Sequence, residues 1–562
     1  MFAARAVAAV VAAAALLVPT VAAGVAPSPA VDGPLASAAD RSLPPAAAPA
    51  NVTPSPRTGP PTGPPRDGPS PAVVAVRPNP VADGDAGEFV VVDPDGVPDL
   101  VLADGEATVP VPPADDPVAL AADPAAARPL TDRRVVPAAD LGLANGGERL
   151  RLRRDGRTVD AVAYEDAPEA ERYAGGRWLP YGFEPRSVHA YGPADATAFL
   201  LPDSPGVVHE TLRSADRRIL VGGYTLTSGR VVDALVAAAR RGVRVRVLLE
   251  GGPVGGLSRR EAAALDRLTR ADVAVRLVDG PRARFSFHHP KYAVVDDRAL
   301  VLTENWDPGG VGGRDNRGWG VRVDSARVAG DLAALFARDF GAHDARPWRV
   351  VRRNASLQSR PVAEGSYPTR FDPERVRAER VRVVTAPGNA ERAVVGVIDG
   401  ATRRVDVLQP SVGGLDGPFV RASLRAAGRG VRVRILLSGA WYAEEENRAT
   451  VERLNALADR RDLPLEARLA DPNGRYGTVH AKGVIADDTV VVGSLNWNVH
   501  SARENREVAL VLDGERVASY YRDAFDADWR GGRPSVPLTL VAVVLVALGL
   551  VVAVVRRRVA FR

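Results

Sequence analysis

The chain carries two copies of a pattern in which arginine and aliphatic residues alternate. Residues 243–249 read Val-Arg-Val-Arg-Val-Leu-Leu, and residues 431–437, 188 positions further on, read Val-Arg-Val-Arg-Ile-Leu-Leu. Each copy follows a glycine, and an alanine-rich stretch with helical spacing (231–240 and 419–429) lies before it. A helix that stops near glycine and leads into an alternating strand is an αβ unit.

This repeat predicts a layered α/β architecture that arose by duplication. Strands that alternate with helices favour α/β layers. A spacing of 188 residues is too long for a solenoid, whose repeats are about 20–45 residues. We therefore expect two tandem halves, at 206–345 and 381–531, joined by a connector at 346–380.

Short β-rich runs separated by turns fill residues 72–165. Residues 149–152 alternate and lead through an Asp-Gly turn at 155–156 into a second alternating run at 158–162, which is typical of a β-hairpin. No helical pattern of comparable strength interrupts these runs. We predict a small β-sandwich over 72–165, followed by a connector at 166–205.

The two ends of the chain predict an exported protein with one membrane anchor. Residues 1–23 combine a basic residue, an apolar run and a small-residue cleavage site, the layout of a secretory signal peptide. Residues 24–71 hold 14 prolines and predict a disordered Pro-rich linker. Residues 536–555 carry no charge and are long enough to cross a hydrocarbon core of about 30 Å as a transmembrane helix. Because arginines follow this stretch, we expect a single-pass cell-membrane protein with its N-terminal domains outside and residues 556–562 as a cytoplasmic basic tail.

The amino-acid composition excludes several kinds of functional site. The chain has no cysteine, which excludes disulfides, thiolate zinc ligands and cysteine nucleophiles. The net charge of +5 is modest for this length and does not by itself indicate a nucleic-acid binder. Of the 73 basic residues only Lys291 and Lys482 are lysine, and arginine does not replace a compact ammonium where the geometry is tight.

Both lysines lie two residues after a histidine, within a second repeated string. The two copies, 191 residues apart, place His289 with His480, Lys291 with Lys482, Asp296 with Asp487, Thr303 with Ser494, and Asn305 with Asn496. In a strand, residues i and i+2 point to the same face, so each half presents an imidazole, an ammonium, a hydroxyl and an amide toward a common point. Two such half-sites would surround a phosphoryl group in transfer, with a nucleophile, an acid and fixed positive charge.

The two strings resemble the paired HxKx4D motifs of the phospholipase D superfamily. The second copy, which runs into Gly-Ser-Leu-Asn, is close to the family pattern. The resemblance covers 206–531 and implies two tandem α/β/α sandwich halves that form one pseudo-twofold site. Members of this family hydrolyse or transfer phosphodiesters through a phosphohistidine intermediate, generally without a metal or other cofactor.

The resemblance also implies roles for the matching residues. His289 and His480 become nucleophile and general acid, and the family order favours His289 as the nucleophile. Glu507 matches a carboxylate that orients a catalytic histidine, and the sequence leaves open whether it reaches His289 or stays with His480. The implied phosphate ligands are Lys291, Lys482, Thr303, Ser494, Asn305 and Asn496, with Asp296 and Asp487 as supporting residues.

The first copy departs from the family pattern at two positions. Leu302 stands where the family has glycine, and Gly318 stands where the second copy has Glu507. The first half therefore lacks an obvious orienting carboxylate, and Asp307 or Asp315 are the candidates to replace it.

The predicted sandwich resembles a lamin-tail domain. The strings that carry this resemblance lie at 78–80, 88–90, 143–148 and 159–164. It implies an immunoglobulin-like binding or spacer module that takes no part in the chemistry.

The sequence favours a phospholipid as the phosphodiester substrate, with hydrolysis and phosphatidyl transfer both open. Only residues 530–535 separate Trp529 from the predicted span, and such a tether reaches about 20 Å. No concentrated basic run with interleaved aromatics is visible, although a surface nuclease would need a basic groove. The alternatives are that nuclease, acting on DNA or RNA, and a catalytically weak surface binding protein. No cofactor, metal or obligate protein partner is implied.

Overall fold

The computed structural model describes residues 70–531, apart from 81–82, 132, 170, 181–182, 184–185 and 281–282. The predicted signal peptide, nearly all of the predicted linker, the predicted span at 536–555 and the tail lie outside the described residues. Within the part that is described, no helix is long and apolar enough to cross a membrane.

Two sheets enclose one apolar core at the N-terminal end of the described chain. A six-stranded sheet has the order β10-β9-β1-β2-β5-β6 and a four-stranded sheet has the order β4-β3-β7-β8. Their strands are β1 (Ala72–Arg77), β2 (Phe89–Asp93), β3 (Leu100–Ala103), β4 (Thr108–Val111), β5 (Val118–Ala121), β6 (Arg134–Pro137), β7 (Gly147–Arg154), β8 (Arg157–Glu165), β9 (Glu171–Ala174) and β10 (Arg177–Pro180), with short helical turns η1 (Asp83–Asp85), α2 (Pro124–Ala127) and η2 (Arg128–Leu130).

The sandwich agrees with the predicted strands but runs further along the chain. The predicted hairpin is present as β7 and β8, turning at Asp155 and Gly156 with φ of 47° and 74°. Strands β9 and β10 continue the larger sheet past the predicted boundary at residue 165, because Val76 of β1 pairs with Tyr173 of β9. Buried residues of both sheets, such as Val90 and Leu152, pack in one core.

The first half is built on a nine-stranded sheet with the order β20-β16-β14-β13-β17-β18-β19-β12-β22. Its strands are β12 (Ala194–Leu201), β13 (Arg218–Gly222), β14 (Arg244–Glu250), β16 (Ala274–Val278), β17 (Tyr292–Val295), β18 (Arg298–Leu302), β19 (Gly318–Asp324), β20 (Ala345–Pro347) and β22 (Glu374–Ala378). Its helices are α3 (Gly206–Arg213), α4 (Gly229–Arg240), α5 (Arg259–Arg270), α6 (Ala326–Gly341) and α7 (Trp348–Val351), and β15 (Leu257–Ser258) pairs with β21 (Leu357–Gln358).

The second half is built on an eight-stranded sheet with the order β11-β23-β29-β28-β27-β24-β25-β26. Its strands are β11 (His189–Tyr191), β23 (Arg380–Ala386), β24 (Arg404–Gln409), β25 (Arg432–Leu437), β26 (Leu465–Leu469), β27 (Gly483–Ala486), β28 (Thr489–Gly493) and β29 (Glu507–Asp513). Its helices are α8 (Ala390–Asp399), α9 (Pro418–Gly428), α10 (Glu444–Arg461), α11 (Val499–Arg503) and α12 (Glu515–Arg530).

The two halves repeat one topology, as the sequence predicts. Strands β16-β14-β13-β17-β18-β19-β12 correspond in order to β26-β25-β24-β27-β28-β29-β23. The predicted helix–glycine–strand units are α4 with β14 and α9 with β25, and Gly242 and Gly430 between them have φ of 89° and 87°. The predicted connectors contribute strands of their own, because β11 joins the second sheet and β12 and β22 join the first.

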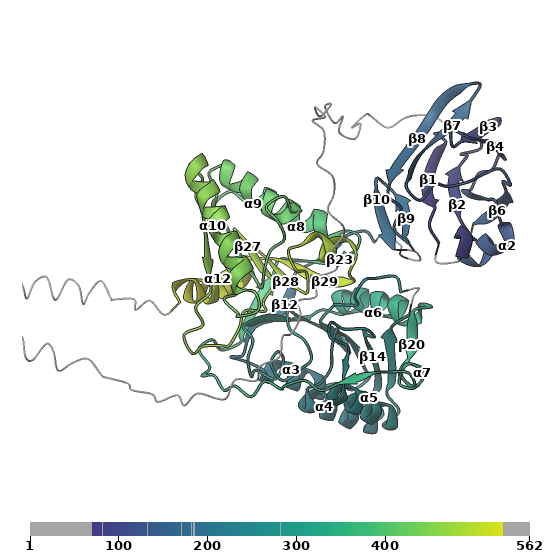
Figure 1. The fold of residues 1–562 in the computed structure, drawn as a ribbon. Coiled ribbons are helices and arrows are strands. Elements are labelled where there is room, and N and C mark those ends of the chain that lie inside the picture. Colours follow the sequence, from purple (N-terminus) through teal and green to yellow (C-terminus); the bar gives the residue numbers. More distant parts are fainter. Residues whose placement is uncertain are drawn as a thin grey trace, which may run out of the picture. The chain divides into compact units, whose positions relative to one another are not determined.

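Each sheet is covered by helices, and one core is common to both halves. Helices α4 and α5 lie on one face of the first sheet, and α8, α9 and α10 belong to the second half (Figure 1). A third core contains residues of both sheets together with α6 and α12, among them Trp319, Phe336, Leu510 and Tyr521. The halves therefore share buried apolar surface.

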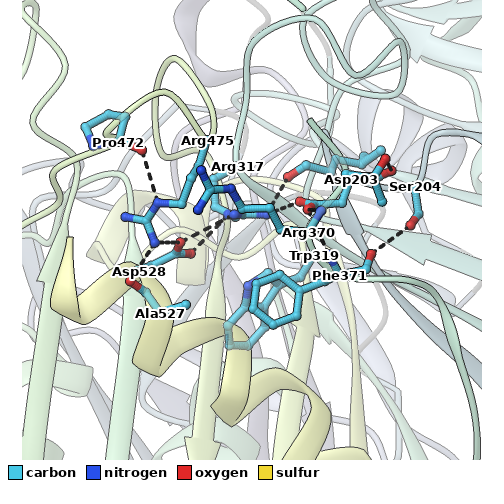
Figure 2. A network of polar contacts seen from close by, with 12 residues as sticks. Asp203, Ser204, Arg317, Trp319, Arg370, Phe371, Pro472, Arg475, Ala527 and Asp528 are labelled. Carbon is cyan, nitrogen blue, oxygen red and sulfur yellow. Dashed lines mark hydrogen bonds and ion pairs between the residues drawn. The ribbon is translucent and has the colours of Figure 1, made fainter. Parts of the chain in front are cut away.

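Two buried ionic clusters join the halves. The Arg317 cluster (Arg317, Asp203, Arg475 and Asp528) pairs a first-half guanidinium with Asp528 of α12, Nε to Oδ2, at 3.0 Å (Figure 2). In the corresponding place, Arg506 of the second half lies 2.9 Å from Asp339 of α6. We call this second set, completed by Arg284 and Asp344, the Arg506 cluster.

Removing the carboxylate of Asp528 is expected to destabilise the protein strongly. Asp528→Ala leaves the buried guanidiniums of Arg317 and Arg475 without their shared partner, which typically costs about 3–5 kcal/mol. The free energy of unfolding, measured by urea denaturation, tests this. Asp195→Ala is the matched control, because Asp195 pairs with Arg377 in the open, where the side chains are 74% and 63% exposed, and such pairs contribute about 1 kcal/mol or less. Equal losses in both variants would contradict the prediction.

Candidate active site

The histidine–lysine strings of both halves lie at the same edge of their sheets. Strand β17 is antiparallel to β13 and begins at the edge where the parallel strands β13 and β14 end. His289 and Lys291 lie just before β17, and Thr303 and Asn305 just after β18, which pairs antiparallel with β17. The second half repeats this arrangement around β27 and β28.

The histidines are therefore placed by the segments that lead into the strands, and not within strands as the i, i+2 argument assumed. His289 N–H donates to the carbonyl of Arg506 at 3.0 Å, and His480 N–H donates to the carbonyl of Arg317 at 3.1 Å. Each histidine backbone is thus held by an arginine of the opposite half.

The imidazole of His289 is bound by the carboxylate of Glu507 from the other half. Nδ1 of His289 lies 2.9 Å from Oε1 and 3.0 Å from Oε2 of Glu507. The His289 side chain keeps 12% exposure, whereas that of Glu507 keeps 1%. Of the two arrangements that the sequence left open, the structure contains the one in which Glu507 reaches across to His289, so that Nε2 is free to face a substrate.

His480 has the same arrangement, but its carboxylate is Glu304, which the sequence analysis missed. Nδ1 of His480 lies 3.1 Å from Oε2 of Glu304, and the His480 side chain keeps 22% exposure. Asn316 donates to the same oxygen at 2.8 Å. The expectation that the first half lacks an orienting carboxylate, or takes one from Asp307 or Asp315, is therefore wrong.

Gly318 explains how a carboxylate from a different position reaches the equivalent place. A Cβ added at Gly318 would lie 2.2 Å from Cγ of Glu304 and 2.5 Å from its Oε1. The side chain of Glu304 thus fills the space beside Gly318, which corresponds in sequence to Glu507. The signal in the sequence was an acidic residue at 304, where the second copy has Leu495, together with the missing side chain at 318.

Leu302 is the other departure from the family pattern. In each half a larger and a smaller residue face each other across two paired strands, but the smaller residue lies on different strands in the two halves. Leu302 is fully buried and pairs with Gly320 of β19. In the second half the small residue is on the other strand of the pair, since Gly493 pairs with Ala509 and a Cβ at Gly493 would lie 2.3 Å from the carbonyl of Val508. The leucine at position 302 therefore changes only the packing between β18 and β19, and the segments that carry the two histidines are held in the same way in both halves.

The two lysines place buried ammonium groups against the backbone of the two histidines. We call this pair the charged floor of the site. Lys291 is fully buried and Lys482 is 2% exposed. Nζ of Lys291 donates to the carbonyl of His289 at 2.9 Å, and Nζ of Lys482 donates to that of His480 at 2.6 Å. Burial and the second ammonium lower the pKa of Lys291 to about 7, and burial lowers that of Lys482 to about 8.

The predicted hydroxyl and amide ligands lie beside these groups. Thr303 Oγ1 donates to Glu304 at 3.3 Å and accepts from the Trp319 N–H, and Ser494 Oγ accepts from the Val508 N–H at 3.0 Å. Asn305 and Asn496 are half-buried. Among the described residues, the side-chain oxygen of Asn305 is buried without a hydrogen-bond partner; this oxygen can only accept, so a phosphoryl oxygen would have to bind the amide N–H₂ of Asn305 instead.

Burial lowers the pKa of both histidines, and burial raises the pKa of Glu507, the partner of His289, to about 8. Burial, Lys291 and Lys482 hold the pKa of His289 well below its ordinary value of 6.5. Burial and Lys482 also lower the pKa of His480, but Glu304 opposes them through its charge and its hydrogen bond. Burial raises the pKa of Glu304, yet His480 outweighs it and the net pKa is lowered.

Asp296 and Asp487 lie at the opposite edge of the sheets, in the turns after β17 and β27. Asp296 accepts three backbone N–H bonds, from Asp216, Arg217 and Arg218, each at 2.9 Å. Asp487 accepts the equivalent bonds from residues 402–404 at 2.7–3.0 Å. Their contacts agree with the supporting role that the sequence predicts.

Comparison with known proteins identifies the paired region. Residues 208–340 and 394–529 match a family model described as "Cardiolipin synthase, PLD-like domain". Mitochondrial cardiolipin hydrolase of Xenopus tropicalis is 31% identical over 118 residues, 21% of this chain and 51% of that protein. A probable phospholipase D of Caenorhabditis elegans is 24% identical over 363 residues, 58% of this chain and 62% of that protein.

Among solved structures, phosphatidylserine synthase of Haemophilus influenzae aligns with a TM-score of 0.43 at 13% identity, covering 59% of this chain and 86% of that one. The family match does not reach the N-terminal sandwich. Its lamin-tail resemblance and immunoglobulin-like class therefore stay predictions.

Exchanging the positions of the carboxylate and the small residue tests the role of Glu304. Glu304→Leu is expected to lower kcat/KM by about 10²- to 10⁴-fold, since His480 loses the group that orients it. The double variant Glu304→Leu with Gly318→Glu reproduces the second half and is expected to recover much of that loss. Gly318→Glu alone places a side chain where Glu304 already lies and is expected to be poorly active. A double variant no better than Glu304→Leu would contradict the exchange.

Activity is expected to fall as the pH rises from about 7 to 9. A lysine loses its charge once the pH exceeds its pKa, which is about 7 for Lys291 and about 8 for Lys482. Each pH unit above the pKa removes about nine-tenths of the remaining ammonium. If the lysines bind the phosphoryl oxygens as the sequence predicts, KM should carry most of the change. A KM that is constant from pH 6 to 9, with kcat also constant, would contradict the proposed charged floor.

Asp487→Asn is expected to weaken the fold and leave the chemistry intact. Burial raises the pKa of Asp487, but the backbone donors outweigh it and lower the pKa below its ordinary value of 3.8. The carboxylate therefore stabilises the fold above about pH 4, and the difference between variant and wild type should vanish as the pH falls through the native pKa. We expect a loss of about 1–3 kcal/mol at pH 7, measured by denaturation, with kcat/KM near that of wild type. A large loss of activity in the folded variant would contradict this.

Proposed function

Because residues 208–340 and 394–529 are two phospholipase D-like domains, we propose that the chain is a phosphodiesterase whose two histidines act on one phosphoryl group. One observation carries the proposal. Each histidine is bound at Nδ1 by a carboxylate of the opposite half, at 2.9 Å and 3.1 Å. This arrangement directs both Nε2 atoms toward a substrate.

In the first step, Nε2 of His289 attacks phosphorus and the bond from phosphorus to the leaving oxygen breaks. The low pKa of His289 keeps its imidazole neutral and nucleophilic, and Glu507 accepts the Nδ1–H. His480, supported by Glu304, gives its Nε2 proton to the departing alkoxide. Lys291 and Lys482 stabilise the charge on the equatorial oxygens.

In the second step, a water molecule replaces the alcohol. His480, now neutral, takes a proton from this water as its oxygen attacks phosphorus, and the bond from phosphorus to His289 breaks. An alcohol in place of water would give phosphatidyl transfer. Asn305 and Asn496, with Thr303 and Ser494, complete the surroundings of the phosphoryl group.

We infer a phospholipid as the substrate. The description of the matching family and the names of two relatives, a cardiolipin hydrolase and a phospholipase D, support this class. The full chain should be assayed in parallel on mixed phospholipid vesicles and on single-stranded DNA. Release of headgroup or phosphatidic acid is the expected result. Cleavage of DNA alone would replace the lipid assignment with the nuclease, and binding without turnover on either would leave the surface binding protein.

Trapping the covalent intermediate tests the order of the histidines. A labelled phosphodiester with a good leaving group needs little acid assistance. His480→Ala should therefore still accumulate label on His289, whereas His289→Ala should accumulate none. Label on His480 in the wild type would reverse the assignment.

Turnover is expected to persist in the presence of EDTA. Within the described residues, no group of three or more metal-ligating carboxylate or imidazole side chains lies together, and the lysines supply the positive charge. Loss of kcat in EDTA that a divalent ion restores would contradict this mechanism.

We also infer that the enzyme is held at the outer face of the cell membrane. The inference rests on the sequence of residues 1–23 and 536–562. Protease added to intact cells is expected to degrade the part up to about Arg533 and to spare a tag placed after Arg562. Protection of an epitope inserted at residues 24–69 would contradict this topology.

A further inference from the structure

Exposed apolar side chains gather around the active site. Among the described residues, Trp441 is 79% exposed, Tyr442 59%, Val254 55% and Val499 42%. We call these four the rim. Trp441 is also the one exposed residue among the seven tryptophans of the chain, all of which are described.

Tyr442 lies on the side of the site that holds His480 and Glu304. Burial and the nearby carboxylates of Asp315 and Glu304 raise the pKa of Tyr442, so its hydroxyl lies on the side that faces the site. Thr478 donates to Asn316 at 3.1 Å, and Asn316 donates to Glu304, which binds His480. The ring of Trp441 lies next to that of Tyr442, with centroids 5.8 Å apart, and projects into solvent.

The remaining rim residues connect to His289. The Val254 N–H donates to the hydroxyl of Tyr224 at 2.6 Å, and the ring of Tyr224 lies 4.9 Å from that of His289. Val499 precedes His500, whose ring lies 6.0 Å from that of Phe287, and Phe287 in turn lies 6.0 Å from Tyr224. The rim therefore borders the site from both halves.

The described chain ends at the same edge of the second sheet. Trp441 follows β25 and Asp471 follows β26, which is parallel to β25. A Cβ built at Gly531, the last described residue, would lie 3.1 Å from that of Asp471. The predicted span at 536–555 begins five residues later, so a bilayer entered there would face the rim.

We propose that the rim is a membrane-docking surface, in which Trp441 lies in the interfacial layer of a phospholipid bilayer. This inference rests on the proposed action on phospholipids. Tryptophan and tyrosine prefer the boundary between headgroups and acyl chains, since each combines a large apolar ring with a polar donor. Tyr442 fits this boundary, because it carries a polar hydroxyl on an aromatic ring and the residue is largely exposed. Docking there brings a headgroup phosphate to the two histidines without removing the lipid from the bilayer.

Tryptophan fluorescence tests the position of Trp441 without any turnover. The full chain is reconstituted in phosphatidylcholine–phosphatidylglycerol vesicles with or without lipids brominated on their acyl chains, and the same is done for Trp441→Phe. No tryptophan follows Trp529, so the predicted span adds no signal. We expect bromolipid quenching in the wild type that is largely lost in Trp441→Phe. Equal quenching in both proteins, or quenching of Trp441 by aqueous acrylamide alone, would overturn the proposal.

Kinetics on two kinds of substrate gives the second test. Trp441→Ala is expected to lower kcat/KM on vesicles about tenfold and to leave kcat/KM on a soluble monomeric phosphodiester unchanged. Val159→Ala is the matched control, because Val159 is 44% exposed but belongs to the sandwich. Equal losses on both substrates, or the same vesicle defect in the control, would overturn the docking role. An enzyme that turns over the soluble substrate but no lipid would refute the proposed function instead, whatever Trp441 contacts.

Discussion

The paired histidines depend on two arginines that are buried between the halves. Arg317 lies directly before β19 of the first half and pairs with Asp528 on α12 of the second, while Arg506 lies directly before β29 and pairs with Asp339 on α6 of the first. A buried guanidinium without its carboxylate is costly, so the halves can close only in the register that satisfies both arginines. The carbonyls of the same arginines accept from His480 and His289. Correct closure therefore also sets the positions of the two histidines.

The spacing of the repeated motif follows from the length of one strand. Four residues separate Lys291 from Asp296, and they form β17, which spans about 13 Å at about 3.3 Å per residue. The lysine is thereby held at the edge with the site, and the aspartate is carried to the far edge, where backbone N–H groups bind it. Local patterns of this kind can be read from sequence, which is why the halves, the helix–glycine–strand units and the motif residues could be predicted.

The role of Glu304 could not be predicted in this way, because it depends on a contact across 176 residues. Aligning the two copies places Gly318 opposite Glu507 and suggests a missing group. Only the packed structure shows that the side chain of Glu304 occupies the space beside that glycine. The strands β11, β12 and β22 were not predicted for a related reason. Their segments have the sequence character of connectors, and only the structure shows that they pair with strands of the two sheets.

Duplication gives the site two nearly equivalent halves, yet the proposed mechanism requires different protonation states of its two imidazoles. Charged groups act on both imidazoles. Both lysines lower the pKa of His289 in addition to its burial, whereas the charge and hydrogen bond of Glu304 oppose the same effects at His480. Glu507 lies as close to His289 as Glu304 does to His480, and burial raises the pKa of Glu507 to about 8, so each imidazole shares its proton with a buried carboxylate of the opposite half. The carboxylate that came from a different position in the first half thus gives His480 a partner equivalent to that of His289, and the two histidines are distinguished only when a substrate places its leaving oxygen beside one of them.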